Sequence, residues 1–232
     1  MKGYERIITY FKPYKFKRNI FITVFALILA IITLNNEKLG LITVGLLIFV
    51  FYKIIVIRKN KKKLVFDREI DEYIKREENI IFNEGLNKLG INVSDVNFID
   101  PIIISEHLFE SKKTSMYIKR GRDGKTRSSN QRTTTFYLSN NQVYVYRKLY
   151  SLVGSEKTSS THEYFYSDIV SVSTFTDGNK NINEIDYQYD VEIFKMTMTD
   201  GNSIECRISD IQALESQIKA LRQVVRDQKK AA

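Results

Sequence analysis

The chain has 232 residues and a formal net charge of +9. Most of this charge is local, because residues 1–63 hold 13 Lys and Arg against two acids, a balance of +11. Residues 64–100 carry −5 and residues 101–232 carry +3, so no basic face interleaved with aromatic residues remains to bind nucleic acid. The single cysteine, Cys206, has no partner for an intrachain disulfide, which agrees with a reducing compartment.

Residues 1–17 interleave aromatic and basic side chains, as in the stretch from Tyr10 to Lys17. This composition predicts a segment at a membrane interface, with its rings at the level of the lipid headgroups. Pro13 should end or begin a helix within the segment.

Two apolar runs follow, Ile20–Leu34 and Leu39–Ile57, and the second contains a single interior cation, Lys53. A membrane-spanning helix needs about 20 apolar residues. The polar link Asn35–Lys38 is too short for anything but a tight turn, so residues 18–58 are expected to form a transmembrane helical hairpin. A buried hairpin in a water-soluble protein is the alternative. A cleaved signal peptide would require a small-residue cleavage site that the link lacks.

Cations flank the hairpin on both sides, whereas Glu37 and Lys38 cancel within the link. Because cations favour the cytoplasmic side, both termini of this multi-pass cell-membrane protein are expected in the cytoplasm. The cations expected to anchor the hairpin at the interface are Lys12, Lys15, Lys17, Arg18, Lys53, Arg58, Lys59, Lys61, Lys62 and Lys63.

Residues 59–100 combine the end of this basic cluster with an acidic segment. Apolar residues recur at helical spacing across residues 64–89, and Gly90 fits a C-cap, so this segment is expected to be a helix. The helix either continues from the second membrane helix as a stalk or folds back onto the domain that follows. Its acidic excess would be repelled by an anionic membrane, which favours projection away from the surface.

Beyond Pro101 the sequence is rich in β-formers and turn signals, among them Asp123-Gly124 and Asp200-Gly201. The segments expected to be strands are residues 114–120, 133–139, 142–146, 163–166, 169–174, 189–199 and 203–208. Residues 209–229 predict an amphipathic helix, with Ser209 and Gln212 as a capping box. This helix should close an open end or face of the strand meander.

The stretches Phe136–Tyr146 and Glu163–Val172 resemble the bacterial pleckstrin-homology-like domains, and the Met198–Asn202 turn and final helix fit the end of that pattern. The resemblance covers residues 101–229 and implies such a domain over residues 101–232. The family pattern has no obvious place for the acidic helix or for the basic stretch 119–132. The expected fold class is therefore a membrane-anchored α+β protein, with a transmembrane hairpin, a linker helix and an antiparallel β-domain that ends in an amphipathic helix.

The basic stretch resembles the β1–β2 loop with which phosphoinositide-binding pleckstrin-homology domains hold headgroups. Lys and Arg supply charge-assisted donors to phosphate oxygens. The alternative is a solvated loop without a ligand. The Gly121–Thr126 segment lacks the spacing of a nucleotide-binding P-loop. The residues expected to bind lipid or phosphate are Lys119, Arg120, Arg122, Lys125, Arg127 and Arg132.

No catalytic signature accompanies these features, and His107, His162 and Cys206 are too scattered for a zinc site of usual spacing. We therefore expect no enzyme, metal or cofactor. The first hypothesis is a membrane-tethered interaction or scaffold protein whose β-domain binds a partner protein and anionic lipid headgroups. The second is a subunit of a homo-oligomeric membrane assembly or channel, in which Ala26-x-x-x-Ala30, Gly40 and Gly45 allow close helix packing.

Overall fold

The structure is a computed structural model that describes residues 2–11, 15–34, 39–61, 65–96, 99–109, 116–177, 191–208 and 211–231. The chain divides into two compact units, Met1–Asp67 and Arg68–Ala232. The second unit therefore takes in the acidic helix, which the sequence analysis had grouped with the juxtamembrane residues. The link Asn35–Lys38, the Pro13 position and the Ser209 cap lie outside the described residues.

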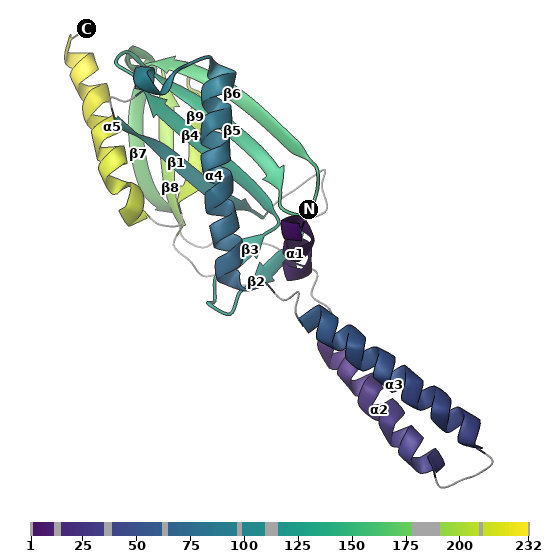
Figure 1. Cartoon of the computed structure of the whole chain (residues 1–232). Coiled ribbons are helices and arrows are strands. Elements are labelled where there is room, and N and C mark those ends of the chain that lie inside the picture. The colour runs from purple at the N-terminus through teal and green to yellow at the C-terminus, as the bar shows by residue number, and fades with distance from the viewer. Residues whose placement is uncertain are drawn as a thin grey trace. The chain divides into compact units, whose positions relative to one another are not determined.

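The described residues of the first unit form the helices α1 (Lys2–Phe11), α2 (Phe16–Leu34) and α3 (Gly40–Lys61). Helices α2 and α3 pack side by side as the predicted helical hairpin (Figure 1). The hydroxyl of Thr43 on α3 donates to that of Thr33 on α2 at 2.9 Å. The side chains buried in this unit recur on α2 at spacings of three and four residues, which marks one face of a helix. They include Asn19, Thr23, Ala26 and Ala30 from α2, with Thr43 and Val50 from α3.

Among the described residues, one helix is long and apolar enough to cross a membrane. It spans Gly40–Asn60 with a mean hydropathy of 2.5, and only 11% of its apolar 18-residue stretch is buried within the structure. Large apolar side chains of α2 are also exposed, with Phe21 at 72% and Ile32 at 65%. The second crossing, which would make the protein multi-pass, stays a prediction.

The described residues of the second unit include seven long strands in two antiparallel sheets. The four-stranded sheet has the order β1-β4-β5-β6 and the three-stranded sheet the order β7-β8-β9. A short hairpin of β2 and β3 lies in sequence between β1 and β4. The elements are α4 (Asp67–Leu89), η2 (Val93–Val96), β1 (Ile99–Leu108), β2 (Ile118–Arg120), β3 (Thr126–Ser128), β4 (Asn130–Leu138), β5 (Gln142–Ser151), β6 (Lys157–Phe165), η3 (Tyr166–Asp168), β7 (Ile169–Asp177), β8 (Val191–Met198), β9 (Ser203–Ile208) and α5 (Ile211–Ala231).

The core of the unit lies between the two sheets and is closed by α5. Phe136 on β4 and Phe194 on β8 meet edge to face across the sheets, with ring centroids 5.1 Å apart. Ile218, Leu221 and Val225 of α5 belong to the same buried cluster. The amphipathic C-terminal helix therefore packs on the sheets, as its apolar stripe predicts.

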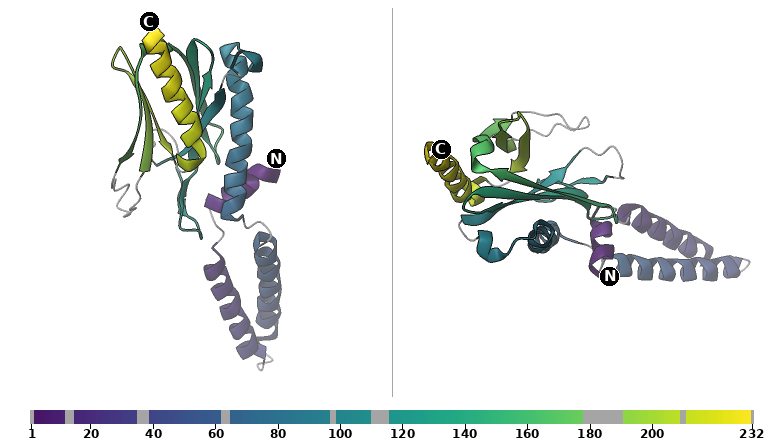
Figure 2. Two further views of the ribbon diagram at one scale, coloured as in Figure 1. Left: turned by 90° about the vertical axis from the view of Figure 1, so that its left-hand side faces the viewer. Right: turned by 90° about the horizontal axis from the view of Figure 1, so that it is seen from above.

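Helix α4 covers the other face of the four-stranded sheet, opposite β7–β9 (Figure 2). The Tyr137 hydroxyl donates to the carbonyl of Phe82 at 2.6 Å. The Tyr146 hydroxyl donates to Glu84, which also forms an ion pair with Lys148. The helix thus folds back onto the domain, and a stalk that projects away is not what the structure contains. The reason is its apolar stripe, which is buried at Ile70, Ile74, Ile81 and Leu86.

Three strands differ from the expected ones. Strand β3 lies between the expected strands 114–120 and 133–139, and its 3 residues are too few to show a pattern. Strand β1 was not expected, because Ile102, Ile103 and Ile104 form a continuous apolar run after a proline rather than an alternating pattern. Strand β6 begins at Lys157, well before the segment 163–166 that was expected to be a strand. Every residue from Lys157 to Glu163 is exposed, so burial imposes no alternation there.

Gly85 provides a test of the α4 contact. A Cβ at this position would overlap the Tyr137 hydroxyl and lie 2.9 Å from Cδ1 of Tyr146. In an exposed helix, Gly→Ala gains about 1 kcal/mol, but overpacking costs about 1–3 kcal/mol and the displaced hydroxyl loses its bond as well. We expect Gly85→Ala to lower the free energy of unfolding of residues 68–232 in urea titrations by about 1–3 kcal/mol.

Asn87→Ala, at an exposed position of the same helix, is the matched control and should be neutral or slightly stabilising. Adding Tyr137→Phe should recover part of the loss, because it removes the overlapping oxygen. A stabilising effect of Gly85→Ala would contradict the packing described above.

Candidate functional site

The basic hairpin, residues 118–128, is a closed and well-bonded element. Its strands pair Lys119 with Arg127 and Arg120 with Thr126. At the tip, the backbone N–H of Gly121 donates to the carbonyl of Lys125 at 2.8 Å, and Gly124 adopts φ +80°. Positive φ is readily accessible to glycine, which explains why Asp123-Gly124 marks the turn in the sequence. The predicted hairpin turn is present, and it carries exposed cations.

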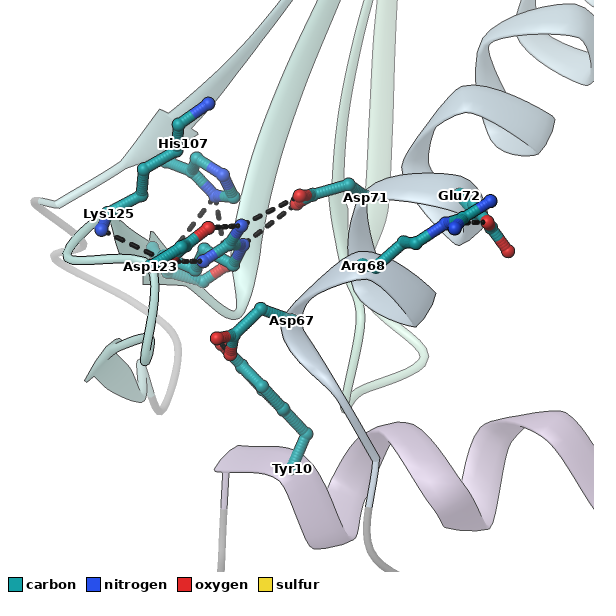
Figure 3. A network of polar contacts seen from close by, with 10 residues as sticks. Tyr10, Asp67, Arg68, Asp71, Glu72, His107, Asp123 and Lys125 are labelled. Carbon is teal, nitrogen blue, oxygen red and sulfur yellow. Dashed lines mark hydrogen bonds and ion pairs between the residues drawn. The ribbon is translucent and has the colours of Figure 1, made fainter.

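Arg127 fixes the base of the hairpin to α4. Its Nε and Nη2 donate to the two carboxylate oxygens of Asp71 at 2.8 and 2.7 Å. Its Nη1 and Nη2 donate to Asp123, at 3.0 and 2.7 Å. Figure 3 shows Asp71 on α4 pointing towards the hairpin that carries Asp123. The Arg127 side chain is only 2% exposed, so its charge is taken up by two carboxylates and is withdrawn from external anions.

The hydrogen bonds from Arg127 lower the pKa of Asp123 to about 2. The carboxylate also accepts the backbone N–H of Lys125 at 3.1 Å, which tightens the tip. Asp123 therefore stays ionised at any physiological pH. Its negative charge is directed at Arg127, the one cation of the hairpin that is buried.

Arg132 is also engaged within the fold. Its Nε donates to Glu106 at 2.6 Å, and Glu106 is 4% exposed. The other oxygen of Glu106 accepts the backbone N–H of Arg207 on β9 at 3.3 Å. The Glu106 carboxylate thus links β1, β4 and β9. Arg132 lies beyond the hairpin, on β4, and contributes to joining the sheets.

Of the six residues expected to bind phosphate, the structure gathers four on the hairpin apart from the buried arginine. Arg120, Arg122 and Lys125 are exposed, and Lys119 is half-buried. The Nε of Arg120 donates to the carbonyl of Gly124 at 3.3 Å, so its side chain lies along the tip. The anion-binding hypothesis therefore rests on Lys119, Arg120, Arg122 and Lys125.

His107 on β1 is half-buried in a network of hydrogen bonds beside the hairpin base. Its Nδ1 accepts the backbone N–H of Ser128 at 3.2 Å and lies 2.6 Å from Nε2 of Gln131. Burial lowers the pKa of His107 to about 4. The ring is therefore neutral at neutral pH. Neither His107 nor Asp71 was expected to take part in this region, because nothing local in the sequence marks the tertiary partner of a lone histidine or of an acid in a helix.

The expected interfacial cations flank one end of the α2–α3 hairpin. Lys15, Lys17 and Arg18 are exposed near the start of α2, and Arg58 and Lys59 near the end of α3. Lys61 is the last residue of α3, while Lys12, Lys62 and Lys63 lie outside the described residues. The Lys53 ammonium lies 3.4 Å from Oδ1 of Asn19 and 5.3 Å from the Phe49 ring centroid. This cation is thus sheltered between the helices.

Small residues of the helical hairpin divide into two groups. Ala26 and Ala30 are 5% and 1% exposed, so this pair serves the packing of the hairpin itself. An added Cβ at Gly40 or Gly45 would meet no atom within 4 Å. Packing between copies of the chain therefore cannot use Ala26 and Ala30 without opening the hairpin.

Other reactive groups are enclosed within the fold. Cys206 is 1% exposed, and burial raises the pKa of its thiol to about 11. Among the described residues, no cluster of three or more His, Cys, Asp or Glu side chains could hold a metal ion.

A cleft of about 160 Å³ between α4, β1, β9 and α5 is smaller than the ~300–1,000 Å³ typical of small-molecule sites.

No protein-family model matches the chain, and no curated protein matches it either.

Asp71 offers a test of how the hairpin is held. Replacing Asp71 by Ala removes two hydrogen bonds to a buried guanidinium, which should lower the free energy of unfolding of residues 68–232 by about 1–3 kcal/mol. Amide hydrogen exchange should accelerate in the hairpin more than in the core strands. Glu72→Ala is the matched control, because its bond to Arg68 is exposed and is worth only about 0.3–0.5 kcal/mol. Equal effects of the two variants would contradict the Arg127 clamp, that is, the contacts of Arg127 with Asp71 and Asp123 that hold the hairpin.

His107 predicts a pH dependence of stability. Because the folded state holds the ring neutral, the unfolded chain binds more protons between pH 6.5 and about pH 4. The free energy of unfolding should fall as the pH is lowered through this window, by about 3 kcal/mol from this residue. Urea unfolding of residues 68–232 should show a flatter pH profile for His107→Gln than for the wild type.

His162→Gln removes the other histidine, in the exposed strand β6, and is the matched control. If His107→Gln left the pH dependence unchanged, a ring that the fold keeps neutral at this position would be ruled out.

Proposed function

We propose that the chain is a membrane-tethered, non-catalytic interaction protein of the cell membrane, with both termini in the cytoplasm. The α2–α3 hairpin anchors it, and the Arg68–Ala232 unit binds a partner protein. The basic hairpin of this unit contacts anionic phosphate headgroups. The observation that carries the proposal is that the basic residues of the hairpin have two different roles. Arg127 is neutralised by two carboxylates and holds the hairpin, whereas the cations of the tip are exposed.

A fixed hairpin is a better anion-binding element than a solvated loop. Binding then loses less conformational entropy, because the Gly121–Lys125 turn and the Arg127 clamp already order the backbone. Three exposed cations lie close in sequence at the tip, namely Arg120, Arg122 and Lys125. Each Lys or Arg near an anionic leaflet contributes about 1 kcal/mol.

The order of the elements supports a pleckstrin-homology-like domain. A four-stranded meander, a three-stranded meander and a closing C-terminal helix follow one another, with the basic hairpin between the first two long strands. That is the position of the β1–β2 loop in the family that the sequence resembles. Helix α4, which covers the four-stranded sheet, lies outside that pattern and is an addition particular to this chain.

The membrane anchor is supported by exposed apolar surface. Phe51 is 67% exposed and Leu41 is 92% exposed on α3, within the helix that is long enough to span a bilayer. Exposed apolar area of this extent is rare on a water-soluble monomer, whereas lipid tails would cover it. The cations at one end of the helical hairpin fit an interface with anionic headgroups.

Vesicle binding tests the role of the basic hairpin. Residues 68–232 should float with phosphatidylcholine vesicles that contain phosphatidylserine and should not float with pure phosphatidylcholine. The double variant Arg122→Glu/Lys125→Glu should weaken the partitioning by more than roughly 30-fold, because the attraction of two cations, about 1 kcal/mol each, is lost and repulsion replaces it. A phosphoinositide arm and an inorganic-phosphate competitor distinguish a specific headgroup from a general anion effect.

The matched control is Arg226→Glu/Lys230→Glu, which changes the net charge equally at exposed positions of α5. Arg127 is left intact, because its reversal would break the fold instead of the binding. Equal loss in the two variants would mean that net charge, not the hairpin, drives association. Absence of binding to any anionic vesicle would contradict the lipid part of the proposal.

A further inference from the structure

Among the described strands, three of the four at the edges of the two sheets are engaged by other elements. On β7, the carbonyls of Val170 and Val172 accept hydrogen bonds from Lys229 and Arg222 of α5, at 2.7 and 3.1 Å. Strand β1 lies against β9 and α5, and Glu106 of β1 bonds the backbone of β9. These contacts occupy groups that would otherwise be open to another chain.

Strand β6 is the exception among the described residues. It ends the four-stranded sheet and pairs with β5 alone, over nine residues without a register shift. All of its residues are exposed except Tyr164, which is half-buried. No hydrogen bond in the described part of the chain joins its outer edge to another element. The strand contains no proline and no bulge, which are two of the devices that protect an edge.

The geometry points to β6 as the interface at which a second copy of this chain pairs, antiparallel and about a twofold axis at Ser160. The two four-stranded sheets would then form one continuous sheet. This inference rests on the proposed function, since it names the partner protein of the interaction domain. It is independent of whether the basic hairpin binds lipid.

The residue pattern of β6 is self-complementary in this register. Lys157 lies opposite Glu163 of the second copy, and Ser159 lies opposite Thr161. Opposite charges and hydroxyl pairs directly across an antiparallel pair are both favourable, and the twofold axis repeats each of them. All four residues have odd numbers, so they share one face of the strand. A shift by one pair would place Lys157 opposite Phe165 and lose the charge pairing.

In this register, even-numbered residues of one copy lie opposite even-numbered residues of the other, and odd-numbered residues lie opposite odd-numbered ones. The backbone N–H and C=O groups that point away from β5 in one copy therefore face the corresponding groups of the other copy. The edge of β6 thus offers backbone hydrogen bonds, and its charge pattern favours pairing with a second copy of the same strand. Tethering both copies in one membrane raises their effective concentration, which favours an interface too small to hold a dimer in dilute solution.

Disulfide trapping in the full-length chain in its native membrane tests the pairing. Ser160→Cys places two thiols opposite each other on the axis, within reach of a disulfide. Mild oxidation should give a product of twice the 27.2 kDa chain on a non-reducing gel. Cys206, the only native cysteine, is 1% exposed, so the wild-type protein reports the background.

Thr158→Cys is the matched control, exposed and on the same face of the strand as Ser160. In the proposed register its two copies are separated by about 13 Å along the strands, beyond the ~7 Å limit for a disulfide. It should give no dimer above background.

Charge reversal tests the register in the Ser160→Cys background. Lys157→Glu or Glu163→Lys alone sets like charges opposite each other and should lower the rate of cross-linking several-fold, on the order of tenfold at most. The double exchange Lys157→Glu/Glu163→Lys restores opposite charges and should restore the rate.

A yield from Ser160→Cys no higher than from Thr158→Cys would overturn the pairing. Cross-linking that ignores both single reversals would overturn the register. A product that contains a different protein would overturn the assignment of a second copy. Vesicle binding by the basic hairpin depends on none of these residues, so failure of either proposal leaves the other standing.

Discussion

The second unit depends on how α4 is held against the four-stranded sheet. Without this helix, the buried hydroxyls and the ammonium of Lys148 on that face would lose their partners. The acids of α4 have a structural purpose, because Glu84 accepts from both Tyr146 and Lys148, and Asp71 accepts from Arg127. Although burial opposes it, the bonds from Lys148 and Tyr146 lower the pKa of Glu84. A helix that looks like a solvated stalk in sequence is therefore a layer of the domain.

The same helix explains why the basic residues divide into two roles. An acid near the start of α4 captures Arg127, and through it the base of the basic hairpin. Asp123 contributes to this clamp from the tip itself. The cations that remain on the tip are thereby presented on an ordered backbone. Local charge along the chain, which is all that the sequence offers, cannot separate a clamp residue from an exposed one.

The spacing of apolar residues predicted the elements that bury one face and expose the other. The stripe that contains Ile218, Leu221 and Val225 predicted α5, and the Asp-Gly pairs predicted two of the turns. Strand β1 and the first part of β6 could not be predicted in this way, since one is a continuous apolar run and the other is exposed from Lys157 to Glu163. The Arg127 clamp and the His107 network join residues far apart in the chain. Their partners are set by the fold, and no spacing within one segment encodes them.

The close approach at Gly85 limits how this domain can move. Sliding of packed helices is a common route for conformational change, but it requires an interface that tolerates more than one registry. Here the Tyr137 hydroxyl occupies the space left by a missing side chain. A shift of α4 by one residue in either direction would bring Glu84 or Leu86 over that ring. The helix and the sheet therefore pack in a single registry, and the unit is expected to transmit force as a rigid body.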